Sequence, residues 1–456
     1  MRLRIIVPCC VLLVVVWSQA PAGQAPQATA NVVLFEGARL ITADGGAPIE
    51  NSAFVVENRR FTVIGRKGQV PLPRGAARVD LTGKTVMPAL VELHGHLGYW
   101  KGLNNLVENF SRENLLDHLQ RFAYHGVAAV VSLGTDRRDV GYQVRDEFRK
   151  TPDPNAAQYF TAGQGISLPN AGPGVPMRPA VYEVTTPADG RKAVQELAEK
   201  KVDRWIKIWH DPGRGKLPRP VYEAIIDEAH QHNLKVLAHV QDLTGMKELL
   251  RAGLDGFAHA AWRDEPDDEF IALIKEHPGV FSLSTFWAGR NQIYGARPKW
   301  IDEPLLHETF TPEEIKRLEN ANTPADAPAK WAAGTLPRNL ARLRAAGLRM
   351  GLGGDIGGIS GREYFGWSSH MEMDSLVRAG LSPSEAIGVA TRNSAELFGL
   401  NDLGTVAKGK SADFIVLDAN PLDDIANTRR IATVYLRGQE IDRAALRAKW
   451  HTSAPN

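Results

Sequence analysis

The chain contains the stretch Val86-Met87-Pro88-Ala89-Leu90-Val91-Glu92-Leu93-His94-Gly95-His96, an apolar run that ends in two histidines separated by one glycine. A short apolar run of this kind, bounded by a proline, predicts a buried β-strand over Val91–His96. Side chains at positions i and i+2 of a strand lie on the same face. We therefore expect the His94 and His96 imidazoles to converge on one metal ion.

Seven similar runs follow this one, and helical patterns separate several of them. The further strands are expected at Val127–Leu133, Gln158–Ala162, Arg204–Trp209, Val236–His239, Gly256–His259, Val280–Thr285 and Arg349–Gly353. The helical patterns are at Pro220–His232, Gly245–Ala252 and Asp267–Glu276, with closing helices around Ser368–Ala379 and Pro383–Phe398. Eight strands that alternate with helices predict an α/β fold, a (β/α)8 TIM-type barrel over residues 87–400. The segment Phe286–Lys330 is too long for an ordinary loop, and we expect a partly helical excursion near the active-site mouth.

Both ends of the chain show a different pattern of short β-runs punctuated by glycine and proline. The runs are Val32–Phe35, Ala53–Val56 and Phe61–Ile64 before the barrel, and Phe414–Leu417 and Thr433–Leu436 after it. We expect residues 31–86 and 401–450 to pair into one small composite β-sandwich domain.

The N-terminal segment has the pattern of a secretory signal. Arg2 and Arg4 precede the apolar run Ile5–Trp17, and the small-residue cleavage pattern Ala20-Pro21-Ala22 follows. We expect residues 1–22 to be removed from an exported protein, periplasmic or secreted, with cleavage after Ala25 and an uncleaved anchor as alternatives. Both cysteines lie in the apolar run, so the mature protein would have no disulfide.

The bulk composition is that of a globular protein. Its 456 residues are 43% hydrophobic and 23% charged, with a net charge of +2. This balance gives no electrostatic reason to expect a nucleic acid partner or, after signal cleavage, a membrane partner. We expect a small-molecule substrate, and a homo-oligomer stays compatible with the composition.

Lys207 lies in the run Trp205-Ile206-Lys207-Ile208-Trp209. A period of two puts Ile206 and Ile208 outward towards helices and Lys207 inside the barrel, where an unpaired lysine is rare. A bare ammonium would be repelled by divalent cations. A lysine carbamate formed with CO2 is instead an anion able to bridge two metal ions. A lysine buried against a carboxylate, or a register one residue different, is the alternative.

Three more candidate residues close predicted strands. His239 and His259 end successive strands, which favours metal binding over the structural role that a single histidine more often has. Asp355 follows Gly351-Leu352-Gly353-Gly354, where small residues allow a close approach of the backbone. Its carboxylate can bind a metal and accept the proton of an attacking water. The alternative is a turn or N-cap aspartate.

His230-Gln231-His232 has the same spacing as His94-Gly95-His96 but lies in a predicted helix. Residues i and i+2 of a helix point to nearly opposite sides. We therefore expect His230 and His232 to be solvated or capping residues.

These residues together resemble the amidohydrolase superfamily, in particular its imidazolonepropionase-like and prolidase-like branch. The resemblance covers Asn31 to Asp442 and includes the tail Gly404-Thr405-Val406-Ala407-Lys408-Gly409-Lys410-Ser411-Ala412-Asp413. Gly354 stands where threonine is frequent, and Ile356 where a smaller residue is common, which leaves the loop shape and the substrate open.

The resemblance implies two divalent metal ions, with zinc the usual metal. It implies His94 and His96 on one ion, His239 and His259 on the other, carboxylated Lys207 between them, and Asp355 as ligand and catalytic proton shuttle.

The expected activity is hydrolysis of an amide C–N bond in a dipeptide or N-acyl amino acid by a metal-bridging hydroxide. A lactonase, esterase or phosphotriesterase could use the same six ligands. A mononuclear deaminase or cyclic-imidate hydrolase is a third possibility, against which an inward Lys207 argues. A non-enzymatic barrel kept as a binding scaffold would be expected to have lost some of these ligands, and none of the six is missing here.

Aromatic and basic side chains follow several predicted strands. The tryptophans are Trp100, Trp209, Trp262, Trp287 and Trp367, and the arginines are Arg137, Arg263 and Arg290. We expect the tryptophans either to line a pocket for a bulky apolar or aromatic group or to seal loops against the barrel. One arginine, with Arg263 the chosen candidate, would hold a substrate carboxylate.

Overall fold

A computed structural model describes residues 32–138, 140–213, 215–259, 264–286, 299–320, 335–358 and 364–452. The predicted signal peptide, residues 1–22, lies outside this part of the chain. Among the described residues, no helix has the length and apolar character needed to cross a membrane.

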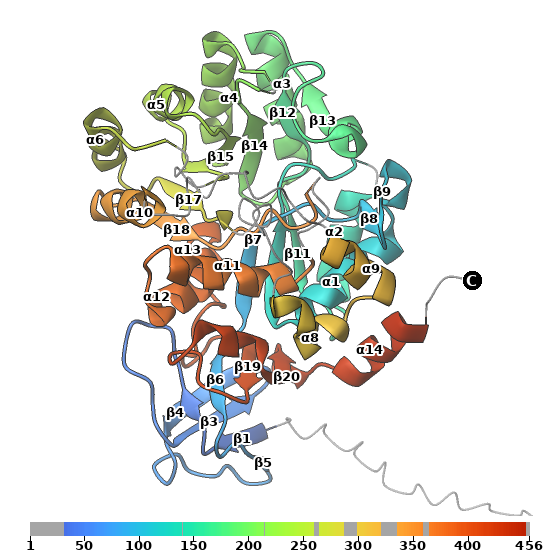
Figure 1. Ribbon diagram of the computed structural model, residues 1–456, viewed down its shortest axis with the longest axis vertical. Coiled ribbons are helices and arrows are strands. Elements are labelled where there is room, and N and C mark those ends of the chain that lie inside the picture. The colour runs from blue at the N-terminus through green and yellow to red at the C-terminus, as the bar shows by residue number, and fades with distance from the viewer. Residues whose placement is uncertain are drawn as a thin grey trace, which may run out of the picture.

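A set of parallel strands forms the centre of the α/β fold (Figure 1). The strands are β7 (Leu90–Gly95), β10 (Val127–Ser132), β11 (Gln158–Thr161), β12 (Gly165–Ser167), β13 (Val181–Glu183), β14 (Trp205–Trp209), β15 (Lys235–His239), β16 (Gly256–Phe257), β17 (Phe281–Leu283) and β18 (Arg349–Gly351). They pair in the orders β11-β10-β7 and β13-β12-β14-β15-β16-β17-β18. Each of the eight predicted strands is confirmed, and β12 and β13 are additional.

Hydrogen bonds join the first and last of these strands. Leu93 donates its backbone N–H to the carbonyl of Leu352 at 3.0 Å, and His96 donates to that of Ile356 at 2.7 Å. On the other side of β10, Gly165 donates to Gly134 at 2.7 Å and so connects the two sheets. The contacts between the segments of β7 and β18 bring the loops after these two strands together.

Helices cover the outer faces of the strands (Figure 1). They are α1 (Arg112–Tyr124), α2 (Gly141–Lys150), α3 (Pro187–Glu199), α4 (Arg219–Gln231), α5 (Leu243–Arg251), α6 (Asp268–Glu276), α10 (Thr335–Ala345), α11 (Trp367–Arg378), α12 (Pro383–Gly388) and α13 (Ser394–Phe398). A further helix, α14 (Arg443–Thr452), packs on the outside of α1. Local signals set their starts, as where Thr186 and Asp189 form a capping box at α3. Ile206 and Ile208 pack in one apolar cluster with residues of α3 and α4, so their outward direction is confirmed.

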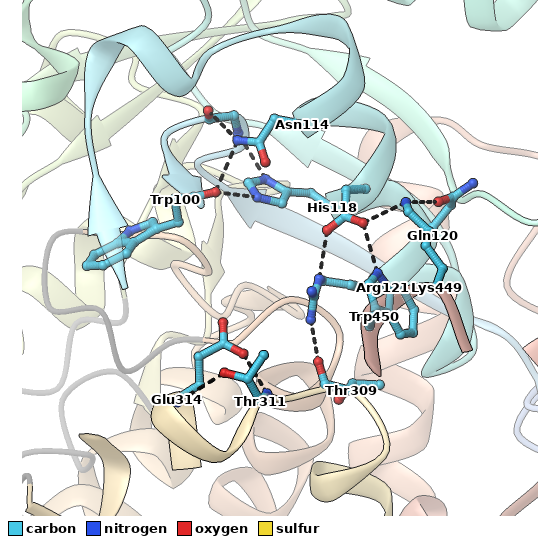
Figure 2. Close-up of polar contacts among 12 residues, drawn as sticks. Trp100, Asn114, His118, Gln120, Arg121, Thr309, Thr311, Glu314, Lys449 and Trp450 are labelled. Atoms are coloured by element: carbon cyan, nitrogen blue, oxygen red, sulfur yellow. Dashed lines mark hydrogen bonds and ion pairs between the residues drawn. The ribbon is translucent and has the colours of Figure 1, made fainter. Parts of the chain in front are cut away.

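The predicted excursion is helical where it is described. It contains α8 (Pro304–His307) and α9 (Pro312–Asn320). Glu303, just before α8, forms an ion pair with Arg429 at 2.6 Å. Arg121 of α1 donates a hydrogen bond to the carbonyl of Thr309, as Figure 2 shows. These bonds fix α8 and the start of α9 against the outer layer of helices.

Two further sheets combine both ends of the chain and lie together at the bottom of Figure 1. One has the order β4-β3-β1-β5 and the other β2-β6-β19-β20-β21. Their strands are β1 (Val32–Glu36), β2 (Arg39–Leu40), β3 (Ser52–Glu57), β4 (Arg60–Arg66), β5 (Ala77–Asp80), β6 (Thr85–Pro88), β19 (Phe414–Leu417), β20 (Ile431–Leu436) and β21 (Gln439–Glu440). The rings of Phe35, Phe54 and Phe414 pack in one core, with centroids 5.0 to 5.4 Å apart.

His370 makes the outer layer sensitive to acid. Its ring is fully buried on α11, where Nε2 donates a hydrogen bond to the carbonyl of His125 at 2.7 Å. Burial lowers the pKa of His370 to about 4, from an ordinary value of 6.5. Between these two pH values the unfolded chain binds a proton that the folded chain does not bind. The free energy of unfolding therefore falls as the pH falls through this window.

We expect His370→Gln to reduce this acid sensitivity. Between pH 7.5 and pH 5 the variant should lose about 2 kcal/mol less stability than the parent. Denaturant titration of the metal-free proteins at both pH values measures the difference. An equal loss in the parent and the variant would show that His370 is not the group responsible.

Candidate metal centre

The end of β7 and the loop after β18 bring three candidate ligands together. Nε2 of His94 lies 3.2 Å from Oδ1 of Asp355, and Nε2 of His96 lies 3.0 Å from the same oxygen. One ligand atom from each residue falls within 4.8 Å of the others, a spacing that could hold a metal ion. The i and i+2 histidines therefore point to one side, as their spacing predicts.

The ends of β15 and β16 supply a second pair. Nε2 of His259 lies 2.7 Å from Nδ1 of His239. The ring centroids of His259 and His94 are 5.1 Å apart, so the second pair adjoins the first. All four histidines are at least nine-tenths buried.

Lys207 is the central residue of strand β14, which lies between β12 and β15 in the sheet, and its side chain is directed into the site. It is 1% exposed, and its Nζ lies 3.5 Å from Nε2 of His94. Gly134 leaves room for it, because a Cβ at that position would come within 2.5 Å of the Lys207 Cβ. The predicted inward direction of Lys207 is confirmed.

Each histidine of the first pair has an outer partner, which is the residue bonded to the ring nitrogen that faces away from the centre. Nδ1 of His94 donates to the carbonyl of Ala258 at 3.0 Å, and Nδ1 of His96 lies 2.9 Å from Oγ1 of Thr135. The outer nitrogen of His94 therefore carries the proton, and its Nε2 lone pair points towards Asp355. Such outer partners orient imidazole ligands in metal sites.

The charge states fit a divalent cation. Burial, and then the Lys207 ammonium, lowers the pKa of His94 well below its usual range. Burial also lowers the pKa of His259 well below that range. For Asp355, burial acts to raise the pKa, but His94 and His96 outweigh it and hold the pKa well below the ordinary value. Neutral imidazoles beside an ionised carboxylate are the donors that zinc and similar cations accept.

Asp355 is held in a strained backbone conformation, with φ at +52°. An aspartate in this left-handed region needs support from its surroundings. The indole Nε1 of Trp100 donates to the carbonyls of Gly357 at 3.1 Å and Gly358 at 2.8 Å. At Gly357 a Cβ would come within 2.4 Å of the His96 carbonyl oxygen, so the loop lies directly against the loop after β7.

Helix α1 in turn holds Trp100 (Figure 2). His118 Nδ1 accepts the backbone N–H of Gly98 at 3.0 Å, and its Nε2 donates to the carbonyl of Trp100 at 2.8 Å. Asn114 donates to the carbonyls of Gly98 and Trp100. Arg317 of α9 lies over the indole, 5.0 Å from a ring centroid. The Asp355 loop is thus connected through Trp100 to α1 and to the excursion.

Sequence comparison agrees with this geometry. The profile of the Amidohydrolase family matches residues 85–441. The chain belongs to the amidohydrolase family. It is a hydrolase that acts on carbon–nitrogen bonds.

Individual relatives of this amidohydrolase cover most of its length. Ochratoxinase from Aspergillus niger is 25% identical over 441 residues, which cover 87% of this chain and 83% of that protein. The crystal structure of a putative prolidase from Bifidobacterium longum has a TM-score of 0.69 at 25% identity, covering 92% of this chain and 99% of that one. Molinate hydrolase has a TM-score of 0.72 at 22% identity, covering 94% and 98%. The structural similarities support the α/β fold.

Of the predicted substrate-binding residues, the structure describes Trp100 and Trp209 near the centre. Trp262, Trp287, Arg263 and Arg290 lie outside the described residues. Trp209 is 3% exposed and lies with its ring against Gly165. Trp100 is half-buried and bonded to the Asp355 loop. Substrate contact by either tryptophan stays a prediction.

Trp367, His230 and His232 all lie away from the metal centre. Trp367 is fully buried in an outer cluster with Trp300, so for this residue the pocket interpretation is wrong and the sealing interpretation is right. His230 is in the last turn of α4, and its Nε2 lies 2.9 Å from Asp255. His232 caps the same helix, as expected.

The sequence interpretation missed two residues beside the ligands. Thr135 follows β10 and contacts His96, and Asp211 follows β14 with Oδ2 3.6 Å from Nε2 of His239. Both come just after a parallel strand, near the strand ends where most of the predicted ligands lie. That shared position was the available signal.

Proposed function

We propose that this amidohydrolase uses two metal ions to hydrolyse the amide bond of a dipeptide or an N-acyl amino acid. The observation that carries the proposal is Lys207, buried on an inward strand face with Nζ 3.5 Å from a ligand nitrogen of His94. A mononuclear site has no need of a lysine at this place. The proposal includes a closed (β/α)8 barrel, with a β-sandwich built from both chain ends.

The donors divide into two sets. His94, His96 and Asp355 would hold one ion, and His239 and His259 the other. Lys207 would serve both as a carbamate, formed when its neutral amine adds to CO2 and releases a proton to solvent. Two bound divalent cations, with zinc suited to these ligands, would supply Lewis acidity and a water of lowered pKa.

Asp355 is the group of this chain that would move the proton. Its carboxylate is ionised, and its Oδ1 lies within 3.2 Å of both His94 and His96. It would accept the proton of the attacking water and deliver it to the leaving nitrogen. A peptide or amide nitrogen needs this proton, because an amide anion is a poor leaving group.

A candidate space for the substrate lies among the loops after β12 and β14, and none of the six candidate ligands lines it. An open cavity of about 650 Å³ is lined by the loop Asn170–Pro176, Asn105, Arg178 and Gly213. Gly213 donates its backbone N–H to Asp211, which faces His239. Arg178 is a cation at this cavity that could receive a substrate carboxylate. The similarity to a putative prolidase supports a dipeptide amide as the bond that is cleaved.

Metal removal tests the proposal. Treatment with a chelator should abolish hydrolysis of a panel of dipeptides and N-acyl amino acids, because the ligands alone cannot activate water. Zinc added with bicarbonate should restore it, with activity rising until about two ions are bound per chain. A parallel panel of lactones, aryl esters and phosphotriesters is the control. Chelator-resistant amide hydrolysis, or turnover of the control panel alone, would contradict the proposal.

A further inference from the structure

We propose that Asp211 is a positioning residue for His239. Its carboxylate would accept a hydrogen bond from the Nε2–H of His239 and so direct the Nδ1 lone pair towards the ion shared with His259. The inference rests on the proposed function, since it requires a metal at the second pair of histidines.

The orientation of His239 decides which of its nitrogens can bind. Nδ1 is the nitrogen that faces His259, at 2.7 Å from the Nε2 of that ring. Two imidazoles can share one ion only if both of these nitrogens offer lone pairs. A neutral imidazole carries one N–H, so the proton of His239 must then be on Nε2.

Asp211 lies where that proton points. Its Oδ2 is 3.6 Å from Nε2 of His239, and its side chain is 13% exposed. The separation is slightly longer than a hydrogen bond, so a small shift of the ring would complete it. In metal sites a carboxylate behind a histidine fixes the tautomer and raises the basicity of the ligand nitrogen.

The local backbone holds the carboxylate in this direction. The N–H of Gly213 donates to Oδ1 of Asp211 at 2.8 Å, and the N–H of Gly215 donates to the Asp211 carbonyl at 2.7 Å. Further along the loop, Lys216 forms an ion pair with Asp242 at 3.0 Å. The turn engages Oδ1, and Oδ2 is the oxygen that faces the imidazole.

The other outer partners show why this one matters. His94 uses a backbone carbonyl and His96 a hydroxyl. Among the outer partners in the described part of the chain, Asp211 is the charged one. We therefore expect the His239–His259 ion to depend on its outer partner more than the His94–His96 ion does.

The test uses Asp211→Asn, with Asp242→Asn as the matched control. An asparagine has one side-chain oxygen, and if Gly213 takes it, an NH2 group faces the N–H of His239. Asp242 belongs to the same loop contacts but pairs with Lys216. Zinc release from each loaded protein would be followed with a chromogenic chelator, and the thermal unfolding of each metal-free protein would be recorded.

We expect the parent to release two zinc equivalents, one of which leaves about 10- to 100-fold faster from Asp211→Asn. Asp242→Asn should release zinc as the parent does, and Asp211→Glu should recover part of the difference. The metal-free midpoints of the parent and Asp211→Asn should agree.

Two results would overturn the inference while leaving the proposed function intact. One is release from Asp211→Asn at the parent's rate, or at a rate shared with Asp242→Asn. The other is a metal-free Asp211→Asn that unfolds at a lower temperature, which would make Asp211 a general structural residue. A parent that binds only one ion would instead overturn the binuclear centre of the proposed function, and the inference with it.

Discussion

Lys207→Met is expected to abolish binding of the second metal ion and to lower amide hydrolysis by at least about 100-fold. Methionine fills a similar volume to lysine but cannot form a carbamate. Loss of an outer partner alone costs 10- to 100-fold in affinity or activity, so loss of a bridging ligand should cost more. Without the bridging anion, four histidines and one carboxylate would face two dications with little compensating negative charge.

The measurement is metal content per chain after purification without chelator, in buffer with and without bicarbonate. The parent should need bicarbonate to reach about two ions, and the variant should not respond to it. Lys235→Met is the control, because Lys235 begins the neighbouring strand β15 and is exposed. Equal metal content and activity in Lys207→Met and the parent would remove Lys207 from the centre.

Asp355→Asn is expected to lower kcat by about 10³-fold, within the range that general acid–base groups contribute. The amide oxygen of asparagine can still bind a cation, but the group cannot accept the proton of water. KM should change much less than kcat, because the lost step is proton transfer.

Metal content must be measured on the same preparation of Asp355→Asn, since Asp355 is also a candidate ligand. A variant that keeps its metal and loses kcat supports the proton-transfer role. Asp255→Asn is a suitable control, because Asp255 lies before strand β16 and contacts His230, away from the centre. Asp355→Asn with parental kcat would exclude Asp355 as the proton acceptor.

Strand positions and inward ligands could be predicted from the sequence because both follow from short-range alternation. Lys207 is an example, since its two isoleucine neighbours define the outward face and leave one direction for the lysine. The same alternation placed His94 and His96 together. Each of these predictions needs only a few consecutive residues.

Other parts of the site depend on contacts between distant segments, which alternation does not encode. The indole of Trp100 reaches Gly358, 258 residues away. Trp367 follows the last parallel strand, β18, yet it packs in the outer layer, because position after a strand does not determine the direction of a side chain. The predicted helix Pro383–Phe398 is interrupted by a π-helical turn at Val389–Asn393, for which the pattern of apolar residues gave no indication.

The joining of both chain ends in one β-region has a consequence for synthesis on the ribosome. Arg60 donates to the carbonyl of Gly409, 349 residues later, and β6 has β19 as an antiparallel neighbour. At ordinary rates of translation, the nascent chain must wait on the order of half a minute for that partner strand. During this interval Phe35 and Phe54 lack the aromatic ring of Phe414 that later covers them. We therefore expect the early sheet to expose apolar surface during synthesis and to benefit from a chaperone.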